Sequence, residues 1–238
     1  GIDTAVWDPE TDPHIPANYS YHDLSGKKKN KKALQEQYKL PIREDVPLIG
    51  MISRLADQKG FDILLESFEE VMALPLQLIL LGTGQKVYHQ AFSAMQKKYR
   101  KKFGLFLGFN NPLAHKIEAG SDFFLMPSRF EPCGLNQMYS LRYGTVPIVR
   151  ATGGLADTII DIDCNSIAGN GFSFKEYDSK ALLDAIKRAV AHYERKDGWE
   201  NIVVRIMTAD ISVEASARKY LNLYNCLKVL PVVREAVV

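Results

Sequence analysis

The sequence predicts an α/β fold in which helices cover both faces of a doubly wound, parallel β-sheet. From Pro47 onward, short apolar segments alternate with longer segments whose apolar residues recur at helical spacing. The apolar segments are nearly continuous rather than alternating, as is usual for strands buried on both faces. Repeated strand–helix units with short connections produce such a sheet through right-handed crossovers.

The chain begins with an irregular segment and a short helix. Residues 1–26 are rich in Pro, Asp and Tyr without a sustained period, so we expect an extended segment on the domain surface. The lysine run 27–32 leads into a helix that ends before Pro41. Basic runs of this kind bind anionic polymers in some proteins, but a solvated helix start is the simpler interpretation.

The repeating units follow in order. Strands are expected at residues 47–53, 75–84, 103–109, 121–128, 145–150 and 171–174. Helices are expected at residues 60–74, 85–102, 112–120, 134–144, 179–196, 197–208 and 212–228. Three regions result: a linker at 1–26, the α/β domain at 27–210 and a C-terminal helical extension at 211–238.

Charge, apolar runs and cysteine content argue against several classes of protein. A net charge of +2 gives no basic field, so we expect no nucleic-acid partner. No apolar run approaches the roughly 18 residues that span a bilayer, so we expect no membrane partner. Cys133, Cys164 and Cys226 contain no CxxC pair, which fits a reducing cytoplasm better than a disulfide framework or structural zinc. Without an initiator Met or a signal-peptide pattern, we expect the sequence to start partway through a longer protein.

Charged residues follow the first expected strand, at the sheet edge where ligands of parallel sheets bind. Arg54 and Lys59 lie five residues apart on the strand-to-helix turn, and Gly60 begins the helix. A guanidinium fork, an ammonium group and helix amides together suit a phosphate or diphosphate. A solvated loop with ordinary surface charges is the alternative, and this turn alone does not decide between them.

Two other strands end in glycine-rich turns. Gly82 and Gly84 form a G-x-G pattern, but Val87 stands where a dinucleotide fingerprint has its third glycine. The pattern also lies beyond the first strand–helix turn, so a nicotinamide-dependent dehydrogenase is not expected. Thr152 and Gly153 end a later strand on the same rim.

A carboxylate follows the fourth expected strand. Glu131 stands three residues before Gly134, where a helix can begin. The backbone amides of Gly134, Leu135 and Asn136 are then expected at a helix amino terminus, where a phosphate oxygen can dock. Glu131 beside them is placed to accept hydrogen bonds from sugar hydroxyls; a helix-capping acid is the alternative.

Several motifs in order resemble one family, the bacterial-type glycogen and starch synthases. The segments that carry the resemblance are RLADQKG, LLGTG, SRFEPCGLNQMYSLRYGTVPIV and TGGLADT, supported by the opening GID and the late MTADIS and SARKYLNLY. They resemble the carboxyl-terminal domain of these enzymes. The resemblance implies a retaining glycosyltransferase of GT-B architecture, in which two Rossmann-like domains face each other, and this chain corresponds to the carboxyl-terminal half.

The resemblance also implies roles for individual residues. Arg54 and Lys59 match the cationic pair that grips the donor diphosphate, and Glu131 matches the carboxylate that contacts the donor glucose. Phe109 falls where an aromatic side chain stacks on the base. The other expected contacts to the donor are Gly108, Ser128, Cys133, Gly134, Leu135, Asn136, Thr152 and Gly153. Two positions depart from the family: Asn136 replaces a common Thr, and Val213 replaces a Trp near the last helix.

The implied reaction transfers glucose, with retention, from ADP-glucose to the non-reducing end of an α-1,4-glucan. Arg54 and Lys59 are expected to stabilise the departing diphosphate electrostatically, so neither a metal nor a cofactor is expected. The family's amino-terminal acceptor domain has no counterpart here, and we expect the chain alone to be inactive. An isolated nucleotide-sugar-binding module and a related GT-B glycosyltransferase with another acceptor are the alternatives.

Overall fold

One parallel sheet organises the protein. The computed structural model describes residues 1–195 and 198–229. Within them, six strands pair in the order β3-β2-β1-β4-β5-β6, all parallel. They are β1 (Leu48–Leu55), β2 (Gln77–Gly84), β3 (Phe103–Leu107), β4 (Phe123–Met126), β5 (Val146–Arg150) and β6 (Phe172–Phe174). The strand order reverses between β1 and β4, so the predicted doubly wound, Rossmann-like sheet is confirmed.

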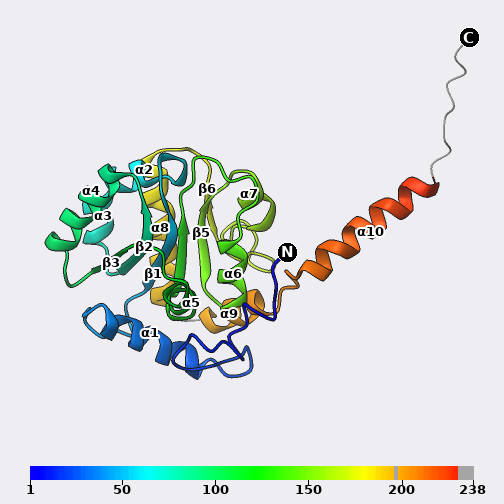
Figure 1. Ribbon diagram of the computed structural model, residues 1–238, viewed down its shortest axis with the longest axis horizontal. Helices are drawn as coiled ribbons and strands as arrows, with labels where there is room; N and C mark the ends of the chain where they lie inside the picture. Colours follow the sequence, from blue (N-terminus) through cyan, green and yellow to red (C-terminus); the bar gives the residue numbers. More distant parts are fainter. Residues whose placement is uncertain (196–197, 230–238) are drawn as a thin grey trace, which may run out of the picture.

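Helices lie on both sides of this sheet (Figure 1). They are α1 (Ser25–Gln37), the 3-10 turn η1 (Asp57–Lys59), α2 (Phe61–Glu66), α3 (Phe68–Ala73), α4 (Lys86–Lys98), α5 (Asn111–Gly120), α6 (Asn136–Arg142), α7 (Gly154–Thr158), α8 (Ser179–Arg195), α9 (Trp199–Met207) and α10 (Val213–Val229). Neighbouring strand residues face opposite layers: Leu48 packs with α1 and α5, whereas Ile49 packs with α2, α3 and α8. Both sheet faces are therefore buried, which explains the continuous apolar strands.

The helix expected at residues 60–74 is two helices, so that prediction is wrong in this detail. α2 ends before Ser67 and α3 begins after it. The Ser67 hydroxyl donates to the Ile63 carbonyl at 3.0 Å, while the Ser67 N–H reaches the same oxygen only at 3.4 Å. A serine that bonds to the carbonyl four residues earlier competes with the helix backbone and bends it.

The predicted solvated lysine run is wrong for two of its five lysines. Lys27 Nζ is buried and donates to the Tyr143 carbonyl at 2.9 Å and to Thr145 Oγ1 at 2.8 Å. Lys31 is 6% exposed and pairs with Asp122 at 2.7 Å. The other three lysines are exposed. Since Lys27 and Lys31 lie one helical turn apart, they dock a single face of α1 on the domain.

The segment before α1 consists of turns and bends and is anchored through its side chains. The Trp7 ring stacks between His115 and Tyr139, with ring centroids 4.0 Å and 3.8 Å apart. The buried carboxylate of Asp12 contacts His115 Nδ1 at 2.8 Å and accepts a hydrogen bond from Tyr143 at 2.6 Å. The segment is irregular, as expected, but packed into the domain through this network.

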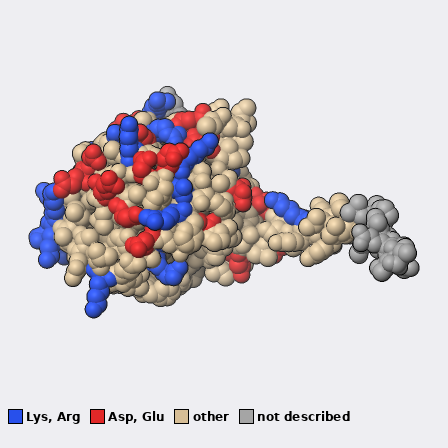
Figure 2. All heavy atoms as spheres, turned by 90° about the horizontal axis from the view of Figure 1, so that it is seen from above, with Lys and Arg blue, Asp and Glu red and all other residues tan. Residues whose placement is uncertain are grey.

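The last helix projects away from the body of the domain (Figure 1 and Figure 2). It begins at Val213, which is 50% exposed, beside the bridge between Ile2 and Ser212. Its exposed apolar side chains include Tyr220, Leu221, Leu223, Tyr224 and Leu227.

The helix expected at 212–228 is confirmed, while the predicted region boundaries at 26 and 210 stay predictions. Residues 230–238 of the predicted extension lie outside the described residues. No helix in the described ranges is long and apolar enough to cross a membrane.

Candidate functional site

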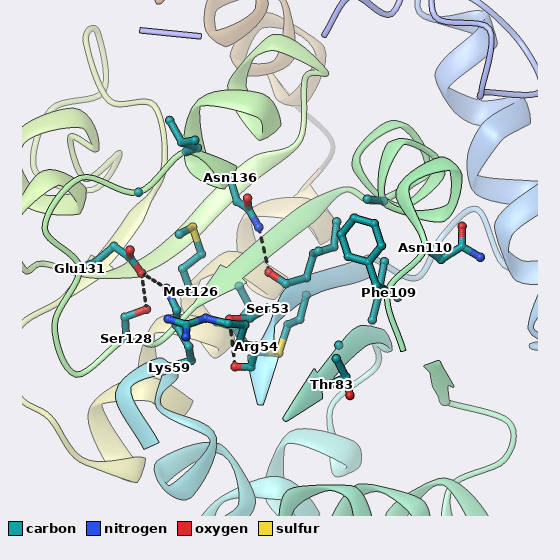
Figure 3. A pocket seen from close by; sticks show the side chains of 18 of the residues that line it. Ser53, Arg54, Lys59, Thr83, Phe109, Asn110, Met126, Ser128, Glu131 and Asn136 are labelled. Carbon is teal, nitrogen blue, oxygen red and sulfur yellow. Dashed lines mark hydrogen bonds and ion pairs between the residues drawn. The ribbon is translucent and has the colours of Figure 1, made fainter. Parts of the chain in front are cut away.

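A cavity of about 340 Å³ opens at the carboxyl ends of β1, β2 and β4, next to the point where the strand order reverses. Figure 3 shows its side chains converging from these strand ends. The lining residues are Met51, Ile52, Ser53, Arg54, Lys59, Leu81, Gly82, Thr83, Gly108, Phe109, Asn110, Asn111, Ala114, Leu125, Met126, Pro127, Ser128, Glu131, Gly134, Leu135 and Asn136. The cavity therefore occupies the usual ligand position of a doubly wound sheet.

The turn that carries Lys59 depends on the glycine that follows it. Gly60 has φ of 75°, a left-handed conformation, and a Cβ there would lie 1.9 Å from the Pro127 carbonyl oxygen. Only glycine allows the turn to approach the loop after β4 so closely. Tyr88 holds the other end of the turn by donating to Asp57 at 2.6 Å. The close packing brings Lys59 to the loop that carries Glu131.

Lys59 and Glu131 form an ion pair at the cavity wall. Lys59 Nζ lies 2.6 Å from Glu131 Oε2, and the two side chains are 18% and 10% exposed. The hydroxyl of buried Ser128 donates to the same carboxylate oxygen at 3.2 Å (Figure 3). These contacts hold the carboxylate and the ammonium group in place at the cavity wall.

Arg54 gives the cavity its excess positive charge. Its side chain is exposed at the end of β1, and within the described part of the chain its guanidinium has no ion pair. Lys59, Glu131 and Arg54 are the charged residues among those that line the cavity, so its net charge is positive. Arg54 contributes a guanidinium group, and Lys59 contributes an ammonium group that pairs with Glu131. The two cations together suit a polyanionic ligand such as a diphosphate.

The loop after Glu131 is shaped by Gly134 and Gln137. Gly134 has φ of 73°, and a Cβ there would meet Gln137 Oε1 at 2.5 Å. The Gln137 amide donates to the Cys133 and Gly134 carbonyls, each at 3.1 Å. The loop therefore folds tightly over the start of α6, where the first amides of a helix have no partner within it.

Asn136 connects the start of α6 to β1. Its Nδ2 donates to the Ile52 carbonyl at 2.8 Å, which brings Leu135 and Asn136 to the cavity beside Ser53. The amide side chain that stands at the family's Thr position therefore has a structural bond in this chain.

A solvent-exposed aromatic ring borders the opposite side of the cavity. Phe109 is 89% exposed and follows Gly108, whose N–H donates to the Gly82 carbonyl at 2.9 Å. Asn110 caps α5 by accepting from the Leu113 N–H at 3.0 Å. The ring is held at the rim between these two backbone anchors, free to stack on a planar ligand (Figure 3).

The structure brings most of the predicted site residues together. Nine of the twelve line the cavity: Arg54, Lys59, Gly108, Phe109, Ser128, Glu131, Gly134, Leu135 and Asn136. Cys133, Thr152 and Gly153 are not among the described lining residues. Gly153 instead packs under the loop, where a Cβ would lie 2.3 Å from the Glu131 carbonyl oxygen. The N–H of Gly154 also donates to the Glu131 carbonyl at 3.0 Å, so these glycines support the Glu131 loop from behind.

The sequence analysis did not predict several polar residues that line the cavity. Ser53 and Thr83 lie near the carboxyl ends of β1 and β2, Asn110 caps α5 and Asn111 begins it. The signal for the asparagines was present, since an Asn immediately before a Pro-containing helix start is a capping pattern. Among the residues that the structure describes, no cluster of three or more His, Cys, Asp or Glu side chains could hold a metal ion.

Comparisons with known proteins identify the family of the chain. Residues 33–202 match the family model of the glycosyl transferases group 1. The chain is 52% identical over 225 residues to glycogen synthase 1 of Geobacter sulfurreducens, covering 94% of this chain and 45% of that protein. It is 50% identical over 226 residues to the glycogen synthase of Thermosipho africanus, covering 94% and 47%. The chain thus spans about half the length of the curated relatives it matches.

A solved structure extends the likeness. The catalytic domain of Starch Synthase IV from Arabidopsis thaliana, bound to ADP and acarbose, superimposes with a TM-score of 0.89 at 38% identity, covering 95% of this chain and 48% of that one. The expected resemblance to glycogen and starch synthases and the expected Rossmann-like half of a GT-B fold are confirmed. Because the family model covers most of the sequence, the chain belongs to the group 1 glycosyl transferases.

Proposed function

We propose that this chain is the donor-binding half of a glycogen (starch) synthase that transfers glucose, with retention, from ADP-glucose to the non-reducing end of an α-1,4-glucan. The observation that carries the proposal is the juxtaposition of Arg54, the Lys59–Glu131 pair and the exposed Phe109 ring around one cavity. Two cations suit a diphosphate, a carboxylate suits sugar hydroxyls and an aromatic ring suits a base. The glycogen synthase relatives support the reaction class.

The proposed chemistry is electrostatic. When the glycosyl–phosphate bond breaks, positive charge develops on the sugar and negative charge on the departing diphosphate. Arg54 and Lys59 stabilise the diphosphate as it leaves, because fixed cations need no reorganisation at the moment of reaction. The ion pair between Glu131 and Lys59 breaks, so that Lys59 binds the phosphate. Glu131, held by its hydrogen bond from Ser128, accepts hydrogen bonds from the glucose hydroxyls. The side-chain cations take the part that a metal ion plays elsewhere, so the proposed reaction uses no metal and no cofactor besides the donor.

The preference for ADP-glucose is the finer part of the proposal. It is supported by the starch synthase structure, whose bound nucleotide is ADP, and by the identity with bacterial glycogen synthases.

The three free cysteines support a reducing compartment, and we propose the cytoplasm. Because the chain spans about half of its relatives, we also propose that the α-1,4-glucan acceptor binds against a separate amino-terminal half. Without it, the chain is a nucleotide-sugar-binding module.

The test is glucan extension from labelled ADP-glucose. The chain alone is expected to transfer little or no glucose, and adding the amino-terminal half of the Geobacter relative is expected to restore transfer. Lys59→Ala is expected to prevent that restoration, while Lys98→Ala, which breaks an exposed ion pair with Glu69 on α3, serves as the control. Robust extension by the chain alone, or transfer only from UDP-glucose, would contradict the proposal.

A further inference from the structure

Four side chains behind the cavity connect the two loops that carry Lys59 and Glu131. Tyr177, which follows β6, lies between two guanidinium groups: Cζ of Arg129 is 4.7 Å and Cζ of Arg150 is 5.2 Å from its ring centroid. The Tyr177 hydroxyl and Arg129 Nη2 both donate to the carboxylate of Asp62, the latter at 2.9 Å. These four described residues, which we call the Tyr177 cluster, do not line the cavity.

Each member of the Tyr177 cluster belongs to a different segment of the rim. Asp62 lies in the first turn of α2, three residues after Lys59, and Arg129 lies two residues before Glu131. Arg150 ends β5 and donates from Nη1 to the Arg129 carbonyl at 2.6 Å and from Nε to the Lys175 carbonyl at 3.0 Å. The cluster therefore joins the turn of Lys59, the loop of Glu131 and the ends of β5 and β6.

The chemistry of the cluster suits this connecting role. Two guanidinium groups near one ring repel each other, and the Asp62 carboxylate neutralises one of them. A lysine cannot replace Arg150, because one ammonium group cannot stack on the ring and reach two diverging carbonyls together. On the backbone, the Arg129 N–H donates to the Gln58 carbonyl at 2.8 Å, so the two loops already meet beside Lys59. The side-chain cluster fixes how they meet.

We propose that the Tyr177 cluster is a positioning device that holds Lys59 and Glu131 in place at the cavity for donor binding. The inference rests on the proposed function, because it assigns the cluster to the same donor site. Tyr177, Asp62, Arg129 and Arg150 act only through the two loops, without touching the donor. Loosening them displaces Lys59 from the cavity that it lines together with Arg54, which weakens the grip on a diphosphate even if the Lys59–Glu131 pair is weakened too.

The test is a double-mutant cycle read by calorimetric titration with ADP. Tyr177→Phe keeps the stacked ring but removes the hydroxyl bond to Asp62, and is expected to weaken ADP binding about three- to tenfold. In a Lys59→Ala background the same change is expected to have no further effect, because the cluster acts through Lys59. Tyr193→Phe is the matched control, since it removes a hydroxyl that contacts Lys31 and the Glu44 carbonyl away from the cavity. An equal loss in both backgrounds would overturn the positioning role.

Hydrogen exchange of the ligand-free chain separates this inference from the proposed function. Tyr177→Phe and Arg150→Lys are expected to speed amide exchange in residues 129–134, and Tyr193→Phe is not. If the parent chain binds no ADP but these variants loosen the loop, the proposed function fails while the loop-holding role of the cluster stands. If the parent chain binds ADP and Tyr177→Phe changes neither affinity nor exchange, the positioning inference is wrong.

Discussion

Substitutions of Lys59 and Glu131 should change nucleotide affinity in opposite directions. Glu131 pairs at 2.6 Å with the Lys59 ammonium group, which the proposed donor diphosphate needs. Lys59→Ala removes a charge-assisted hydrogen bond, worth about 1.5–3 kcal/mol, and should weaken ADP binding about 10- to 150-fold. Glu131→Gln frees Lys59 from a pair worth about 1 kcal/mol and should tighten ADP binding about fivefold.

Glucose transfer separates the two roles further. Glu131→Gln should lower transfer once the amino-terminal half is present, because an amide accepts sugar hydroxyl bonds less strongly than a carboxylate. Calorimetry measures the affinities, and thermal melting checks that the loss of affinity for Lys59→Ala exceeds its loss of stability. Lys98→Ala is the matched control, since Lys98 pairs with Glu69 on the surface at 53% and 65% exposure. If Glu131→Gln weakens ADP binding as Lys59→Ala does, the competition between carboxylate and diphosphate is refuted.

Three further substitutions test the aromatic rim, the turn at Gly60 and the buried carboxyl of Glu118. Phe109→Ala should weaken ADP binding by about 1–3 kcal/mol of lost base stacking, with an unchanged melting temperature because the ring is 89% exposed; equal ADP affinity would exclude the stacking role. Gly60→Ala should lower the melting temperature by at least about 2 °C, because its φ is 75° and its Cβ would lie 1.9 Å from the Pro127 carbonyl oxygen; an unchanged melt would show that the turn can move away. Burial raises the pKa of Glu118 from its ordinary value of 4.5 to about 8, against a hydrogen bond from Ser140 and the charge of Lys27. Because the pKa of Glu118 is higher in the folded protein than in the unfolded chain, protonation of Glu118 stabilises the folded state. This contribution to the free energy of unfolding is fully present below about pH 4.5 and is lost as the pH rises through about 8. Glu118→Gln should therefore flatten the fall in unfolding free energy measured by urea titration between about pH 5 and pH 8, and an identical slope would contradict the assignment.

The sheet and its ligand-binding edge could be predicted from local patterns. Continuous apolar runs separated by amphipathic segments specify a parallel sheet, and parallel strands bring their carboxyl ends to one edge. Arg54, Lys59 and Glu131 were therefore predictable as neighbours. The ion pair between Lys59 and Glu131 was not predictable, because it depends on how closely the turn at Gly60 approaches Pro127, and this is a contact between distant segments.

Burial of charged residues was the weakest part of the sequence prediction. Lys27 and Lys31 look like solvated lysines because their acceptors lie in distant segments, at Tyr143, Thr145 and Asp122. The break at Ser67 was also hidden, since the apolar residues before and after it keep a helical period. Such features depend on tertiary contacts rather than on local spacing.

The cavity is proposed to bind the nucleotide of the donor. The direct measurement is calorimetric titration of the chain with ADP, with UDP as the comparison, each with and without EDTA. We expect saturable ADP binding that is clearly tighter than UDP binding, unchanged by EDTA and weakened by Lys59→Ala. Absence of binding by both nucleotides, or ADP binding that Lys59→Ala leaves unaltered, would contradict the assignment of the donor site to Arg54, Lys59 and Glu131.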